Sequence, residues 1–156
     1  PGEQFLFESL DIALKNSYQE HAARAYTNII SSSLTFKEYD LARRYLQDGL
    51  GYCEERTLDS WTKYILSYKS RMLLETGDWQ QAASIAKNLL QNPEQPAIIR
   101  VGALITLATI EVRRGEPGAL PHLQEAKSLA FVTMEYQRII PLLIAFLEYE
   151  WLTGNN

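Results

Sequence analysis

Apolar residues recur along the chain at intervals of three and four positions, and Gly and Pro interrupt this pattern only at wide intervals. The spacing gives each segment one apolar face with the period of an α-helix, and no stretch alternates as a strand would. The pattern therefore predicts an all-α fold of about eight helices. The expected ranges are 4–16, 19–35, 38–54, 59–76, 79–91, 97–114, 118–131 and 134–152.

The expected helix boundaries carry ordinary start and stop residues. Gly77 and Gly115 follow helical runs, and Pro96 lies near the start of another. Pro141 falls inside the last range, where its missing N–H predicts either a kink or a later start of that helix.

One type of turn returns along the chain. Residues 75–79 are followed by similar turns at 113–117 and 152–156, and residues 36–39 occupy the equivalent place earlier. In such a turn a glycine ends one helix in a left-handed conformation, an acidic or amide residue caps the next helix, and an aromatic ring packs between them. Pro117 takes the place of the aromatic ring in one of the turns. The regular spacing predicts a repeat of helix pairs.

A single helix pair cannot bury its apolar face alone, so neighbouring pairs should stack into a solenoid with a continuous core. We expect a single domain over 1–156, with repeats at 19–57, 59–95 and 97–132 and half repeats at 4–16 and 134–153. Small residues are expected where helices cross, and larger apolar residues fill the space between them. The small residues are Ala42, Gly49, Ser70, Ala82, Ala86, Ala108, Ala119 and Ala126. The larger ones are Tyr26, Ile29, Leu46, Leu66, Leu73, Leu89, Leu104, Leu107 and Leu123.

Composition and charge restrict the classes of function that the chain could have. The apolar content of 46% is that of a globular domain, and a net charge of −4 argues against a basic surface for nucleic acid or anionic membrane. The longest uncharged apolar stretches, 101–110 and 139–147, are too short to cross a bilayer. One cysteine and the absence of a signal peptide favour a cytoplasmic protein. The missing initiator Met suggests a piece of a longer protein.

The central turn and its flanking helices resemble the tetratricopeptide repeat. The shared pattern is a small residue, a Gly-Asp-aromatic turn and then alanines on the next helix, and it is carried by Ser70, Leu73, 77–79, Ala82, Ala86 and Leu89. This resemblance implies a right-handed superhelical solenoid of antiparallel helix pairs. The period of 38 to 40 residues exceeds the standard of about 34, which implies longer helices.

Three short phrases are similar to the repeat regions of bacterial signal-transduction ATPases, including LuxR-type and maltose-regulator-like transcription regulators. They lie at 21–28, 52–56 and 58–61. In those proteins the repeats follow a nucleotide-binding domain and serve as a sensor or interaction arm. This chain contains no phosphate-binding loop and no basic recognition helix, so neither ATP hydrolysis nor DNA binding is assigned to it.

No residues suggest catalysis or metal binding. His21 and His122 lie in separate repeats, and the one acidic residue at a ligand-like spacing is Glu125, three residues after His122. Cys53 has no histidine near it in the sequence, and no nucleophile turn presents a serine. We therefore expect no enzyme, no metal and no cofactor.

The resemblance implies a concave groove lined by the first helix of each pair. The residues expected on or near it are Arg24, Thr27, Asn28, Ser31, Tyr64, Ser67, Tyr68, Arg71, Thr109 and Arg113. Guanidinium groups beside tyrosine and small hydroxyl side chains suit peptide carboxylates or acidic side chains.

The function expected from these observations is a non-enzymatic module of a larger bacterial signalling or transcription regulator, which binds a protein, a peptide or a small inducer. The alternative is a stand-alone adaptor that organises a protein assembly. A phosphate-binding loop and a helix-turn-helix in the flanking reading frame would distinguish the two. Because the end ranges 4–16 and 134–152 keep apolar faces without partner helices, we expect further repeats on both sides and self-association through the end helices.

Overall fold

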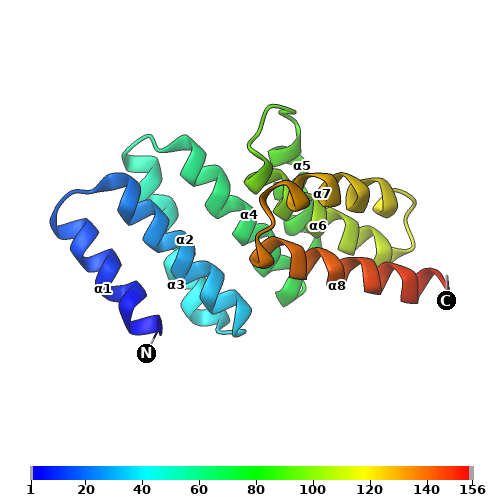
Figure 1. Cartoon of the computed structure of the whole chain (residues 1–156), viewed down its shortest axis with the longest axis horizontal. Coiled ribbons are helices and arrows are strands. Elements are labelled where there is room, and N and C mark those ends of the chain that lie inside the picture. The colour runs from blue at the N-terminus through cyan, green and yellow to red at the C-terminus, as the bar shows by residue number, and fades with distance from the viewer. Residues whose placement is uncertain (1, 155–156) are drawn as a thin grey trace. The chain divides into compact units, whose positions relative to one another are not determined.

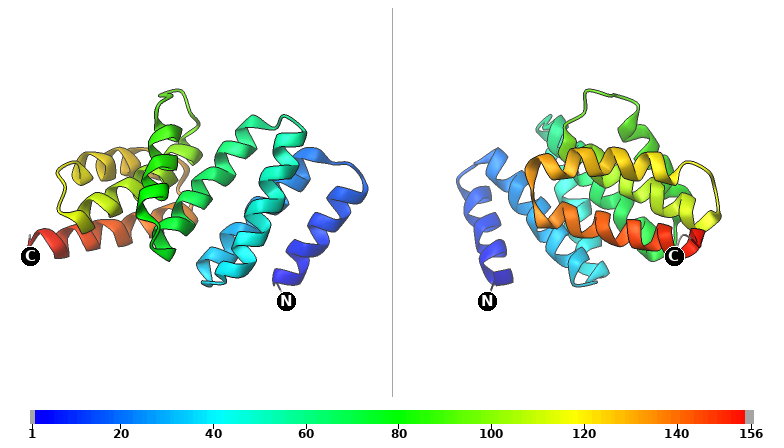
Figure 2. Two further views of the ribbon diagram at one scale, coloured as in Figure 1. Left: turned by 180° about the vertical axis from the view of Figure 1, so that it is seen from behind. Right: turned by 45° about the vertical axis from the view of Figure 1, so that its right-hand side comes forward.

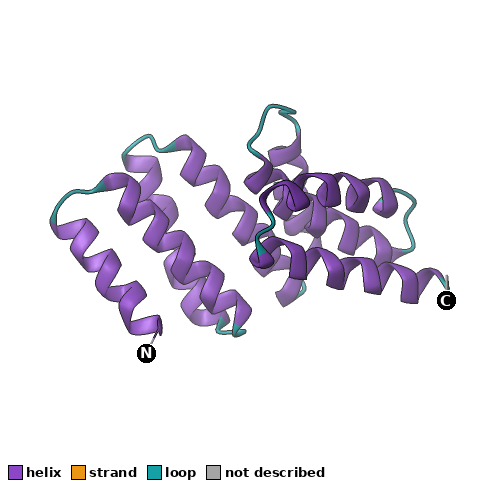
Figure 3. Ribbon diagram, viewed as in Figure 1, coloured by secondary structure: helices purple, strands orange, loops and turns teal. Residues whose placement is uncertain are grey.

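The computed structural model describes residues 2–154, and helices dominate this range (Figure 1, Figure 3). No strand occurs within it. The helices are α1 Gly2–Lys15, α2 Gln19–Thr35, α3 Tyr39–Glu55, α4 Asp59–Thr76, α5 Trp79–Leu90, α6 Ala97–Arg114, α7 Ala119–Thr133 and α8 Tyr136–Thr153. The all-α prediction and all eight expected ranges are confirmed, with each end within two residues of its expected position. Asn155 and Asn156, which form part of the turn expected at 152–156, lie outside the described residues.

Pro141 lies inside α8, and the helix begins five residues before it, at Tyr136. The alternative that Pro141 marks a late start is therefore wrong. A proline near the N-terminal end of a helix removes only one early hydrogen bond, which the rest of the helix can tolerate.

The chain divides into two compact units, Pro1–Met72 and Leu73–Asn156, and the boundary falls inside α4. In the first unit α1, α2, α3 and the first part of α4 lie side by side, each running opposite to the one before (Figure 2). In the second unit α6 packs against α5, α7 and α8. The single domain and the right-handed superhelix stay predictions.

The two cores are built as the repeat pattern predicts, with small residues inside. All eight of the expected small crossing residues are buried, and of the nine larger ones only Leu66 is partly exposed. In the first unit Ala23, Ala42 and Ile65 bring α2, α3 and α4 into one buried cluster. Beside it, the rings of Phe7, Tyr26, Tyr45 and Tyr52 pack between α1, α2 and α3. Burial in this aromatic cluster raises the pKa of Tyr26, with a smaller contribution from Asp48.

The turns between helices follow a strict spacing that the sequence pattern alone did not reveal. Ser17, Lys37, Thr57 and Gly77 all have positive φ, and each lies 20 residues after the one before. At the first three of these turns, the next N–H donates to the carbonyl five residues earlier, at 2.8–2.9 Å. A left-handed residue followed by this hydrogen bond is a common way for an α-helix to end. One helix and the turn after it therefore span 20 residues, and two such helix-turn segments make up the 40-residue repeat.

The later turns keep the left-handed residue but lose the spacing of 20. Gly115 and Gly154 have positive φ, as expected for both turns.

At the central turn, Asp78 caps α5 by accepting a hydrogen bond from the Gln81 N–H at 3.0 Å, and the Trp79 indole donates to the Leu74 carbonyl at 3.2 Å. The expected acidic cap and aromatic ring are thus both present at the central turn.

Candidate functional site

The candidate site is the shared face of α2 and α4 in the first unit. The indole Nε1 of Trp61, in the first turn of α4, donates a hydrogen bond to the Glu20 carboxylate in the first turn of α2. Because the two helices run in the same direction, this contact places their side chains in register along the face. Equivalent positions are 40 residues apart, so Arg24 matches Tyr64, Asn28 matches Tyr68 and Ser31 matches Arg71.

Three of the four residues predicted on α2 are accessible to a ligand. Arg24 and Asn28 are exposed and Ser31 is half-buried, with spacings of four and three residues that keep them on one side of the helix. Thr27 is buried, and its hydroxyl donates to the Arg24 carbonyl at 2.8 Å. The expectation that Thr27 lines a groove is therefore corrected, because its hydrogen-bonding capacity is used inside the helix.

On α4 the predicted residues form an aromatic row that ends in a cation. The hydroxyls of Tyr64 and Tyr68 share a hydrogen bond of 2.9 Å, and their ring centroids are 5.1 Å apart. The ring of Trp61 lies 6.3 Å from that of Tyr64. These residues and Arg71 are half-buried, so each keeps part of its surface available.

Ser67 and Thr109 do not reach a surface. Ser67 is buried on α4 and donates to the Tyr64 carbonyl at 3.0 Å, and Thr109 is buried on α6 and donates to the Ile105 carbonyl at 2.8 Å. Both were expected on the groove, and both are instead small residues at helix contacts. A hydroxyl that bonds to its own helix can be buried at little cost, so sequence pattern does not separate it from an exposed one.

Arg113 holds two helices of the second unit together. Its guanidinium donates to both oxygens of Glu148 on α8, at 2.5 and 3.1 Å, and its Cζ lies 5.7 Å from the centroid of the Trp79 ring. The hydrogen bond to Glu148 raises the pKa of Arg113, and burial opposes this rise. The structure thus assigns Arg113 a packing contact, in a different unit from the α2–α4 face.

Trp61 belongs to the face but was not among the predicted site residues. Its signal was present, since residues 61, 64, 68 and 71 have the spacing of one helix side. The sequence analysis used Trp61 only as part of the phrase at 58–61, which is similar to other repeat proteins, and so did not place it on the face. Glu20 was missed because its contact with Trp61 spans 41 residues.

The other residues weighed for chemistry in the sequence, Cys53, His122 and Glu125, lie apart from this face. Cys53 is fully buried, and burial raises the pKa of its thiol to about 11, so the thiolate needed for attack is disfavoured. His122 bonds to Glu111 at 2.8 Å, while Glu125 pairs with Arg100, so His122 and Glu125 do not act together. Within residues 2–154 no three side chains of metal-binding type are grouped. Nor is any helix in that range long and apolar enough to cross a membrane.

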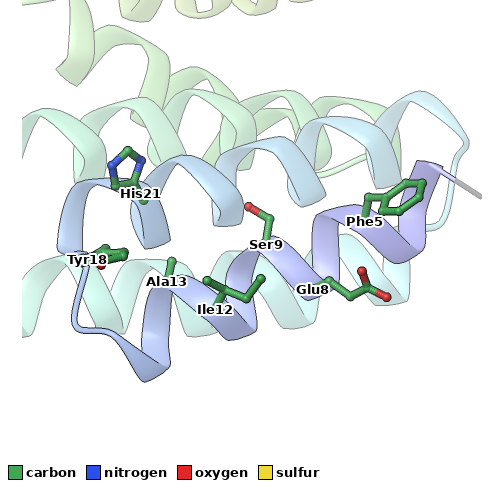
Figure 4. Close-up of a pocket in the computed structure, with 7 residues that line it drawn as sticks. All are labelled: Phe5, Glu8, Ser9, Ile12, Ala13, Tyr18 and His21. Atoms are coloured by element: carbon green, nitrogen blue, oxygen red, sulfur yellow. The ribbon is translucent and has the colours of Figure 1, made fainter.

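An open hollow of about 470 Å³ lies along α1 and the start of α2 (Figure 4). It is lined by Phe5, Glu8, Ser9, Ile12, Ala13, Tyr18 and His21. Its polar groups, Glu8, Ser9 and His21, are set apart along its length (Figure 4). The hollow is mainly the uncovered apolar side of α1 and not a site built around a ligand.

Comparison with known proteins gives no guidance on this face. No protein family model, no curated protein and no solved structure matches the chain.

Proposed function

We propose that this chain is a non-enzymatic binding module, whose α2–α4 face takes a short protein segment that carries carboxylates. In this proposal the helix pairs stack as a right-handed, tetratricopeptide-like superhelix. The module serves as the sensor or interaction arm of a larger cytoplasmic bacterial regulator. The regulator context rests on the phrases at 21–28, 52–56 and 58–61, which lie on α2, at the end of α3 and at the start of α4.

The observation that carries the proposal is the pairing of equivalent positions on two parallel helices. Arg24, Asn28 and Ser31 on α2 match Tyr64, Tyr68 and Arg71 on α4, and all six are exposed or half-buried. Equivalent positions in a repeat face the same way, so their side chains form two adjacent rows. The positions between them, Thr27 and Ser67, are buried in both helices, which supports the register.

The chemistry of the rows suits an acidic segment. Guanidinium groups and phenol hydroxyls donate hydrogen bonds to carboxylates, and the Trp61, Tyr64 and Tyr68 rings offer apolar contact at low entropy cost. Positions 24 to 31 span about 10 Å along the helix, enough for about three residues of an extended chain. This is the size of a short linear motif.

The test is selection from a displayed library of short random peptides on the intact chain. The expected result is a consensus that contains Asp or Glu beside an aromatic or aliphatic residue, with binding that weakens as salt is added. A consensus without acidic residues, or peptides whose binding is unaffected by Tyr68→Ala and Arg71→Ala together, would contradict the proposal.

A further inference from the structure

The helix α8 carries two apolar faces, of which the unit buries only one. Ile139, Leu142 and Ala145 face the core, in contact with α6 and α7. A second stripe on the opposite side is exposed to between 48% and 79%. It consists of Tyr136, Ile140, Leu143, Ile144, Leu147 and Trp151. An apolar helix face of this size is normally buried, so this stripe is the surface to explain.

The stripe has the form of a helix-packing surface. Its residues fall within an arc of about 100° around the helix, and their spacings of three and four are those of packed helix pairs. No charged residue lies within it. Of the charged residues of α8, Arg138 pairs with Glu135 and Glu148 pairs with Arg113, both outside the arc, while the exposed Glu150 lies at its edge, about 20° beyond Leu143 around the helix. The exposed side chains offer on the order of 600 Å² of mainly apolar surface. A stable interface needs about 800 Å² from each partner, so the stripe supplies most of one side.

We propose that the stripe on α8 binds the same stripe of a second copy of this chain, with the two helices antiparallel about a two-fold axis near Ile144. An uncharged apolar stripe needs an equally uncharged partner, and a second α8 supplies one. The exposed apolar face of α1 does not, because Glu8 lies between Phe5 and Ile12 and would lose its hydration against α8. A two-fold contact also closes after two copies, whereas α8 on α1 would propagate.

Sedimentation equilibrium of this 156-residue chain over a concentration series tests this inference. The mass should rise from 17.8 kDa towards twice that value and stop there. Added salt should strengthen the dimer, because both copies carry a net charge of −4 and the stripe itself is uncharged. A mass that stays at the monomer, or that grows beyond two copies, would overturn the inference.

Variants locate the contact. Ile144→Glu should raise the dimer dissociation constant by about 100-fold or more, because two carboxylates would meet near the axis. Ile12→Glu on α1 is exposed to the same 57% and should leave the dimer unchanged. Mixing Ile144→Glu with Ile144→Lys should restore association, and circular dichroism checks that each variant is folded. Loss of association in Ile12→Glu, with none in Ile144→Glu, would place the contact on α1 and refute the proposal.

A covalent readout is independent of variant stability. Ile144→Cys should form a disulfide-linked dimer under mild oxidation, while Ile12→Cys should not. The native Cys53 does not compete, because it is fully buried and its thiol is held neutral. Equal cross-linking of the two variants would contradict a specific α8 contact.

Discussion

Trp61 donates its indole N–H to the carboxylate of Glu20, so the first turns of α4 and α2 are joined across 41 residues of chain. This contact fixes the register of the α2–α4 face. It also explains why the residues that the sequence predicted on α2 and on α4 occupy equivalent positions of the two helices. The proposed binding face therefore depends on residues 40 positions apart and not on any local motif.

Gly49 and Gly51 provide a matched pair for the packing of α3. A Cβ at Gly49 would lie 3.2 Å from both Ile65 Cδ1 and Tyr26 Cβ, whereas one at Gly51 meets nothing within 4 Å. Gly51→Ala should therefore raise the free energy of unfolding by up to about 1 kcal/mol through helix propensity. Gly49→Ala should lower it by about 1 kcal/mol or more, because the crossing of the helices is overpacked. Urea unfolding measures both, and an equal gain in the two variants would contradict the close crossing.

The buried thiol of Cys53 gives the stability a defined pH dependence. Burial raises its pKa from 9.0 to about 11, with Glu20 adding to the rise and Arg56 opposing it. The folded state thus holds the proton more tightly than the unfolded state. The stabilisation is fully present below pH 9 and is lost as the pH rises from 9 to 11. The free energy of unfolding should fall across this window.

Cys53→Ala separates the thiol from other groups that titrate in the same range, such as Tyr26. The variant should be less stable at neutral pH because a small cavity remains, but its loss of stability between pH 9 and 11 should be shallower. Parallel curves for the variant and the native chain would show that Cys53 is not buried as described.

Arg113 and Arg114 test the contact between α6 and α8. Arg113 makes a two-point ion pair with Glu148, while Arg114 lies 3.7 Å from Glu116 at an exposed turn. Arg113→Ala should cost about 1 kcal/mol of stability, since it leaves Glu148 half-buried without its partner. Arg114→Ala should cost about 0.5 kcal/mol or less. Thermal unfolding of the two variants gives the comparison, and equal midpoints would argue against the role assigned to Arg113.

The helices could be predicted because each has a continuous apolar face, and the glycines predicted the turns at Gly77, Gly115 and Gly154. The turn at residues 36–39 was expected from its spacing and not from a glycine, and the positive φ of Ser17, Lys37 and Thr57 could not be predicted. These residues have no preference for positive φ, and Thr57 is β-branched, which disfavours it. The left-handed conformation there is accompanied by a hydrogen bond from the next N–H to the carbonyl five residues earlier, so the 20-residue spacing appears only in the folded chain.

For the candidate site, six of the residues expected on the groove are exposed or half-buried on α2 and α4: Arg24, Asn28, Ser31, Tyr64, Tyr68 and Arg71. That they line a groove stays a prediction. The spacing could not tell that Thr27 is buried, because a hydroxyl bonded to its own helix tolerates the interior. It also could not assign Arg113 to Glu148, since the two are 35 residues apart.

The most direct test of the account is the effect of charge reversal on peptide affinity. Isothermal titration calorimetry measures the affinity of two double variants for a peptide selected on the native chain. One double variant carries Arg24→Glu and Arg71→Glu on the α2–α4 face, and the other carries Arg43→Glu and Arg44→Glu on α3. Both pairs change the net charge equally, so only position differs. The account predicts that the first pair weakens binding by about 100-fold or more, while the second changes it by about threefold or less. Equal losses from the two pairs, or full affinity in the first, would contradict binding at the α2–α4 face.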